Sequence, residues 1–169
     1  MTPPDDTEAP AGQAAKGPIG VDFELALEHP SLVELLGYWW EKCPPGALPS
    51  RDDIDPEQLV EHLRYLFMVD VEQAPFRFRY RLVGTALTTF LERDSTGKYL
   101  DEVYGPEGAA VVAERLRAPV AARAPVRISA PVQFARTDWR AFEGLLLPLA
   151  DADGSINMIL GELRIGMHD

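Results

Sequence analysis

The run from Phe76 to Leu82 constrains the fold most, because its side chains alternate with a period of two. Aromatic and aliphatic residues occupy every second position, and arginines fill the positions between them. A β-strand directs successive side chains to opposite faces of its sheet. The sequence therefore predicts a half-buried strand. Its arginine face is expected to be solvated or to pair with an acidic partner or with the chain's own carboxylates.

Other segments supply neighbours for this strand. Residues 65–72 are rich in strand-forming residues, and the turn at 73–75 joins them to the alternating run, which predicts a hairpin. Three further strands are expected near the C-terminus, at 126–135, 141–150 and 156–165. Pro131 predicts that the first of these lies at a sheet edge, because proline cannot donate to a strand ladder. Pro148 predicts a bulge or an unpaired end.

Helical spacing appears before and between the strands. Apolar residues recur at helical intervals from residue 32 to 43, with Ser31 and Glu34 as a possible capping box and Pro44 ending the helix. A short helix is expected to begin at 55–56. A longer helix is expected to open at Pro106, with Pro119 ending or kinking it. Between them, residues 86–104 are expected to form short helical turns.

The order of these elements predicts an α+β domain, with an antiparallel sheet and helices on one face. Residues 1–20 are acidic and rich in proline, glycine and alanine, and we expect them to be a disordered tail. Residues 21–47 form an N-terminal helical extension. Residues 48–169 form the main domain.

Composition limits the classes of partner. The net charge is −11, whereas binding to phosphate backbones needs clustered lysine and arginine, so nucleic acid and anionic membranes are not expected partners. No apolar run approaches the ~20 residues of a membrane span. The N-terminus does not look like a signal peptide. Cys43 is the single cysteine, so neither an internal disulfide nor a cysteine-held metal is expected. We expect a cytoplasmic protein.

Four segments carry a resemblance to a known family. They are Tyr38-Trp39-Trp40, Leu48 to Pro56, Phe78 to Thr85 and Arg93 to Glu102, and the turn "LPLADADGS" follows them. Together with the element order, they resemble PAS domains, and in particular a bacterial subgroup of single-domain PAS-like proteins. The resemblance covers about residues 30 to 165.

The resemblance implies a five-stranded antiparallel sheet in the order 2-1-5-4-3, with helices on one face and an extra N-terminal helix. It also implies sensing and protein–protein signalling rather than catalysis. PAS domains often hold a small molecule between sheet and helices, where apolar side chains supply most contacts. The candidates for such contacts here are Tyr80, Leu82, Phe90, Tyr99, Leu116, Phe134, Leu145 and Leu147. The alternative is that these residues are only core.

Two named cofactors are not expected. Haem-binding relatives present a histidine from a helix between the second and third strands, but this chain has only His29, His62 and His168. A photoreactive flavin needs a cysteine in the corresponding helical region, whereas Cys43 lies in the N-terminal helix. The cofactor, if any, is unknown, and no metal site is expected.

An enzyme is the weakest of three interpretations. The histidines lack metal-binding spacing, and no nucleophile elbow or phosphate loop is present. Asp52, Asp53 and Asp55 are flanked by prolines, which favours helix capping. The first interpretation is a sensory or regulatory module that binds a ligand, a partner protein, or both. The second is a small-molecule binding protein without a signalling partner.

The N-terminal helix is the candidate contact for partners. Tryptophan is enriched at interface hot spots. We expect this helix to pack on the outer face of the sheet and to contribute to a homodimer through Leu32, Leu36, Trp39 and Trp40.

Overall fold

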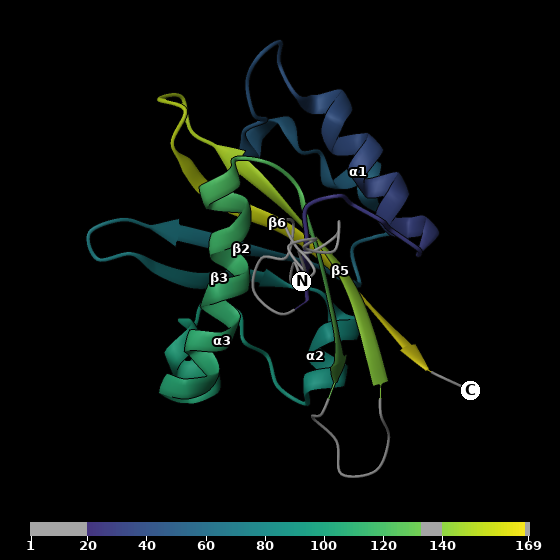
Figure 1. The fold of residues 1–169 in the computed structure, drawn as a ribbon, viewed down its shortest axis with the longest axis vertical. Coiled ribbons are helices and arrows are strands. Elements are labelled where there is room, and N and C mark those ends of the chain that lie inside the picture. Colours follow the sequence, from purple (N-terminus) through teal and green to yellow (C-terminus); the bar gives the residue numbers. More distant parts are fainter. Residues whose placement is uncertain (1–19, 133–139, 168–169) are drawn as a thin grey trace, which may run out of the picture.

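The computed structural model describes residues 20–132 and 140–167, whose strands form one antiparallel sheet (Figure 1). Six strands lie in the order β1-β4-β5-β6-β2-β3. Their bounds are β1 Val21–Asp22, β2 Leu66–Glu72, β3 Arg77–Val83, β4 Val126–Val132, β5 Arg140–Ala150 and β6 Ile156–Met167. If β1 is set aside, the remaining five follow the predicted order 2-1-5-4-3, which is therefore confirmed.

The short strand β1 is the addition that the sequence did not predict. It pairs with β4 through Val21 and Ile128, so β4 is covered along part of its outer edge. The N–H of Ser129 donates to Gly20 O at 2.8 Å on that side. Pro131 lies two residues further along β4, where backbone N–H groups point to the same edge. The N–H that this proline lacks would therefore point to a part of the edge that β1 does not cover.

Three α-helices and two short 3-10 helices complete the described part of the chain. The α-helices are α1 Pro30–Lys42, α2 Thr85–Leu91 and α3 Leu100–Ala122, and the 3-10 helices are η1 Arg51–Asp53 and η2 Pro56–Leu59. The expected capping box at Ser31 is wrong, because α1 begins two residues earlier than that box requires. His29 is the N-cap, and its Nδ1 accepts a hydrogen bond from the Ser31 N–H at 3.1 Å. Pro30 then occupies a position that needs no donor.

The helix α3 is kinked at its start. Gly105 has φ 72° and ψ 176°, a conformation that glycine tolerates and that interrupts the helix before Pro106. The expected helix start at Pro106 is thus the second part of a longer element. Pro119 does not end this helix, which continues to Ala122.

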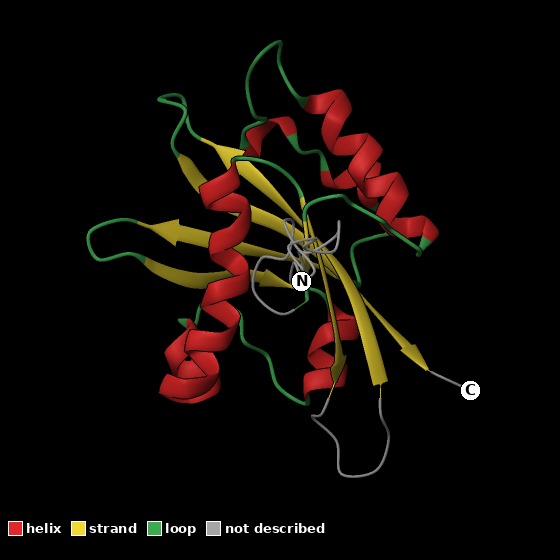
Figure 2. Ribbon diagram, in the orientation of Figure 1, coloured by secondary structure: helices red, strands yellow, loops and turns green. Residues whose placement is uncertain are grey.

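The sheet separates two apolar layers, and the helices cover both faces (Figure 2). We call the face under α2 and α3 the inner face and the face under α1 the outer face. Leu146 on β5 belongs to the inner cluster, whereas its neighbours Leu145 and Leu147 belong to the outer cluster. All three are fully buried, because the sheet is covered on both sides.

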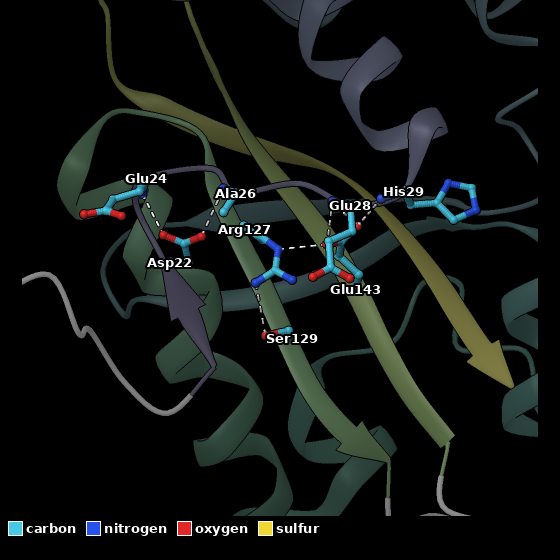
Figure 3. Close-up of polar contacts among 8 residues, drawn as sticks. All are labelled: Asp22, Glu24, Ala26, Glu28, His29, Arg127, Ser129 and Glu143. Atoms are coloured by element: carbon cyan, nitrogen blue, oxygen red, sulfur yellow. Dashed lines mark hydrogen bonds and ion pairs between the residues drawn. The ribbon is translucent and has the colours of Figure 1, made fainter. Parts of the chain in front are cut away.

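The helix α1 is held to the outer face at several points. The indole N–H of Trp39 donates to Pro148 O at 3.1 Å. Leu32 and Leu35, on the side of α1 that faces the sheet, are fully buried. The segment that leads into α1 is tied to Glu143 on β5 (Figure 3). The expected packing of this helix on the outer face is confirmed.

The arginines of β3 pair with the chain's own carboxylates. Arg77 lies 3.3 Å from Asp101, while Arg79 and Arg81 lie 3.2 and 3.7 Å from Asp70. This outcome matches one of the alternatives left open by the sequence. None of the described helices is long and apolar enough to cross a membrane.

Candidate functional site

A cavity of about 700 Å³ lies between the inner face of the sheet and the helices α2 and α3. The residues that line it belong to the inner-face strands, to the two helices and to the 93–95 segment that links the helices. Aliphatic and aromatic side chains make up most of the surface, and examples are Phe67, Leu87, Phe90, Leu116, Ile128 and Leu146. This volume and apolar character match the usual range for small-molecule sites.

Two phenols meet at the wall of the cavity. The hydroxyl of Tyr80 on β3 lies 2.7 Å from that of Tyr104 on α3, so a hydrogen bond joins the sheet to the helix. Burial raises the pKa of Tyr80 well above its usual value, and the Tyr104 hydroxyl adds to that shift. Burial also raises the pKa of Tyr104, against the lowering effects of the Tyr80 hydroxyl and Arg93. Both phenols therefore stay neutral at pH 7 and keep their protons.

Ser95 is a buried polar group in the same wall. Ser95 is only 1% exposed, and its Oγ has no hydrogen-bond partner among the described residues. Leaving a buried hydroxyl without a partner costs about 1 to 3 kcal/mol. Such a cost calls for a particular explanation, such as a bound ligand.

Arg93 and Arg115 bring positive charge to the lining. The Arg93 guanidinium donates to Val103 O and lies 5.7 Å from the Tyr104 ring centroid. The Arg115 guanidinium lies 5.6 Å from the Phe142 ring centroid. Neither arginine forms an ion pair with a described carboxylate, and the described lining contains no acidic residue.

Three of the predicted contact residues line the cavity: Tyr80, Phe90 and Leu116. Leu82 does not, and it is 42% exposed. The reason is a β-bulge, since Met68 pairs with Leu82 while Val69 pairs with Tyr80, which leaves Arg81 as the extra residue. The extra residue reverses the alternation. Val83 therefore lines the cavity in place of Leu82.

The other predicted contacts lie elsewhere. Leu145 and Leu147 pack on the outer face, one residue out of step with the cavity-lining Leu146. Tyr99 caps the start of α3, where its hydroxyl donates to Glu72 at 3.1 Å and the Arg77 guanidinium lies 3.5 Å from its ring centroid. Phe134 lies outside the described residues.

The four predicted partner contacts on α1 differ in their exposure to solvent. Leu32 and Trp39 are buried against the sheet of their own chain, so they are not available to a partner. Leu36 is half-buried and packs against the same outer cluster. Trp40 is 56% exposed and is the one residue of the four that faces solvent.

The sequence prediction missed Arg93, Ser95 and Tyr104. Tyr104 follows Leu100 and Val103 at helical spacing, which is a signal for the inner side of a helix. No comparable pattern marks Ser95, because its burial depends on the fold of the connecting turn.

Neither the histidines nor the cysteine of the described chain lies in the cavity. His62 is buried on the outer face, where its Nδ1 lies 2.7 Å from Glu162 Oε1. Cys43 follows the end of α1, and its thiol donates to Trp39 O. Within residues 20–132 and 140–167, no group of three or more histidine, cysteine or acidic side chains is placed to hold a metal ion.

Sequence and structure comparisons place the chain among known folds. The profile of the PAS domain matches residues 27–164. A sensory box sensor histidine kinase from Vibrio cholerae is similar in structure, with a TM-score of 0.49 and 13% identity over 68% of this chain and 90% of that one. The PAS domain of Bordetella pertussis BvgS gives 0.48 and 16%, over 68% and 89%.

A third similar structure belongs to a longer protein. An RNA-binding light-oxygen-voltage receptor gives a TM-score of 0.43 and 17% identity, over 70% of this chain and 36% of the receptor. No curated protein matches the chain in sequence.

Proposed function

Because this chain belongs to the PAS domain family, we propose that it is a sensory module that takes up a small, mostly apolar molecule in the inner-face cavity. The observation that carries the proposal is the cavity itself, with about 700 Å³ of space and a few polar groups in an apolar wall. Pockets of this kind fix a ligand through apolar contact and orient it through a few hydrogen bonds.

The chemistry of the lining favours binding over catalysis. Within the described lining, the ionisable side chains are two arginines and two tyrosines, without a carboxylate or histidine. General acid–base catalysis most often uses those missing groups. Both tyrosines have a raised pKa, which makes them hydrogen-bond donors rather than bases.

A ligand in this cavity touches both the sheet and α3, so it is placed to alter their packing. Binding shifts a conformational equilibrium only through different affinities for the two states. The proposed output is a change in a contact with a partner protein or with a second copy of the chain. On α1, Val33 and Trp40 are exposed and lie two helical turns apart on one side.

Dye binding tests the cavity. N-phenyl-1-naphthylamine is neutral and becomes fluorescent in apolar surroundings, so the protein is expected to give a saturable rise in fluorescence. Val112→Trp should abolish that rise, because Val112 lines the cavity. The matched control is Val33→Trp, since Val33 is 52% exposed on α1. Equal binding by both variants would show that the dye, and the proposed ligand, do not use this cavity.

Sedimentation tests the output through a second copy. A dimer is expected at high micromolar concentration, and Trp40→Glu should weaken it, because a charge replaces an exposed apolar ring. A protein that stays strictly monomeric removes the homodimer and leaves a different partner protein as the output. Native mass spectrometry of protein from its own host would identify a bound molecule directly.

A further inference from the structure

From the polar groups of the cavity wall, we infer that the ligand is a small carboxylic acid, with one carboxylate on an apolar body. This inference rests on the proposed function, because it names the ligand class for the same cavity. Four groups carry it: the paired phenols Tyr80 and Tyr104, the hydroxyl of Ser95 and the guanidinium of Arg93.

The phenol pair of Tyr80 and Tyr104 has one hydroxyl proton that their shared hydrogen bond does not use. Two hydroxyls carry two protons, and the hydrogen bond between Tyr80 and Tyr104 uses only one of them. Whichever phenol donates, the other keeps an O–H that needs an acceptor. No described side chain supplies that acceptor, because the lining has no carboxylate, amide or histidine side chain. A ligand oxygen would satisfy it.

Ser95 adds a second donor with no partner. Its hydroxyl is buried and makes no hydrogen bond within the described chain. A hydroxyl can donate as well as accept, and the described lining offers it no carboxylate, amide or histidine acceptor. The two hydroxyls and Arg93 together therefore make a wall rich in donors and poor in acceptors.

The charge of the wall selects an anion among possible acceptors. The chain as a whole carries −11, yet both charged groups of the described lining are arginines, and neither is paired with a described acid. A cationic ligand would be repelled by Arg93 and Arg115. A carboxylate matches the planar guanidinium and the hydroxyl donors, and charge-assisted hydrogen bonds are stronger than neutral ones.

The turn that carries these donors is fixed before any ligand arrives. The N–H of Gly97 donates to Tyr80 O at 2.7 Å, and the N–H of Tyr80 donates to Lys98 O at 2.9 Å. These bonds hold the turn of Ser95 against β3. Arg93 is held at the first turn of α3 by its bond to Val103 O. Donors fixed in place lose less freedom when a ligand binds, which favours affinity.

Competition between two matched probes tests the inference. The first is 4-phenylbutanoate and the second is 4-phenylbutanamide, which has nearly the same shape but no charge. Each is titrated against bound N-phenyl-1-naphthylamine at pH 7. The carboxylate is expected to bind about tenfold more tightly than the amide, as one added charge-assisted bond predicts.

Substitutions assign that preference to the wall. Arg93→Gln should reduce the ratio of carboxylate affinity to amide affinity to near one. The control is Arg117→Gln, which removes one positive charge from α3 outside the lining and should leave that ratio unchanged. Should Arg93→Gln not fold, Tyr104→Phe and Ser95→Ala provide the same readout, since each removes one donor. Ser95→Ala should not destabilise the empty protein, because it removes an unpartnered hydroxyl.

The outcomes separate this inference from the function on which it rests. Equal competition by the two probes, with the dye still bound in the cavity, overturns the carboxylic acid and leaves the sensory function standing. A preference for the carboxylate that survives Arg93→Gln but falls with Arg117→Gln also overturns it. Failure of the dye to bind the unaltered protein overturns the proposed function and the ligand class together.

Discussion

Arg127 Nε on β4 donates a hydrogen bond to Glu143 Oε2 on β5 at 2.9 Å, on the outer face of the sheet (Figure 3). The same carboxylate accepts the backbone N–H groups of Glu28 at 3.0 Å and His29 at 2.8 Å. His29 is the N-cap of α1, so one carboxylate joins two strands to the start of this helix. The charge of Glu143 therefore contributes, beside the packing of Trp39, Leu32 and Leu35, to holding α1 on the sheet.

Acid should weaken this link. Burial raises the pKa of Glu143, but the N–H groups of His29 and Glu28 and the Arg127 guanidinium outweigh it, so the pKa lies below its usual value. A lowered pKa in the folded protein contributes stability above the unfolded value of about 4.3, and that stability is lost as pH falls through the folded value. We expect Glu143→Gln to be less stable than the unaltered protein at pH 7, with a gap that narrows toward pH ~3.

Urea unfolding across this pH range measures the gap. Glu24→Gln is the control, because Glu24 is exposed on the same segment. It should follow the unaltered protein at every pH. Parallel curves for the unaltered protein and Glu143→Gln would contradict a role for the charge.

The adjacent tryptophans of α1 should differ sharply in their contribution to stability. Trp39 is 1% exposed and bonds to Pro148 O, whereas Trp40 is 56% exposed. Trp39→Phe removes a buried hydrogen bond and leaves unfilled volume, which we expect to cost about 1 to 3 kcal/mol of unfolding free energy. Trp40→Phe should stay within about 0.5 kcal/mol. Urea unfolding of the two variants measures both values, and comparable losses would argue against the packing of α1 on the outer face.

The contrast between these tryptophans illustrates what the sequence leaves open. Helical spacing predicted α1 and its apolar side, but Trp39 and Trp40 are neighbours, and spacing alone does not show which one turns inward. The strand run "LLLPL" poses the same problem, because a strand that is buried on both faces has no alternation to read. The run therefore does not show that the candidate contacts Leu145 and Leu147 lie on the outer face and that Leu146 lies on the inner one.

The alternation of β3 places one predicted contact at the cavity and misplaces the next. Tyr80 follows the alternation of β3, but the bulge at Arg81 comes two residues before Val83, and no turn residue or proline announces it. Ser95 was beyond prediction for a different reason. Its burial results from backbone bonds between residues 80 and 97–98, which are contacts between separate elements. The strand order came from the family resemblance, since strand patterns alone do not fix it.

A buried polar contact between the turn that follows η2 and strand β6 gives a further prediction. His62 Nδ1 lies 2.7 Å from Glu162 Oε1, and the Glu162 side chain is fully buried. Arg164 Nη2 lies 3.4 Å from the same oxygen and also bonds to Ser31 Oγ on α1. Removing Glu162 would take away the acceptor of the largely buried Arg164 guanidinium and of the His62 ring, and a buried charge that loses its partner is costly. We expect Glu162→Ala to lower the unfolding free energy by about 3 to 5 kcal/mol.

Glu34 provides the control for that substitution. Its carboxylate lies 3.7 Å from the other nitrogen of His62, but its side chain is 74% exposed. Exposed pairs contribute little, so Glu34→Ala should change the unfolding free energy by less than about 1 kcal/mol. Denaturant unfolding of both variants distinguishes the two partners of His62. Similar losses for Glu34→Ala and Glu162→Ala would contradict the importance of burial here.

High pH should reduce the stability that the buried Tyr80 phenol contributes to the folded protein. Burial raises the pKa of Tyr80 well above its usual value of about 10, so the folded state holds the phenol proton more tightly than the unfolded chain does. The resulting stability is fully present below the unfolded pKa and is lost as pH rises toward the folded one. The unaltered protein should therefore lose stability above pH ~10, and Tyr80→Phe should lose less.

At pH 8, Tyr80→Phe is expected to cost about 1 kcal/mol, because the hydrogen bond to Tyr104 is gone. Urea unfolding at pH 8 and at about pH 10.5 tests both statements. The gap between Tyr80→Phe and the unaltered protein should shrink at the higher pH, since ionisation penalises only the chain that carries the phenol. A gap of constant size would mean that the Tyr80 proton is held no more tightly in the folded cavity wall than in the unfolded chain.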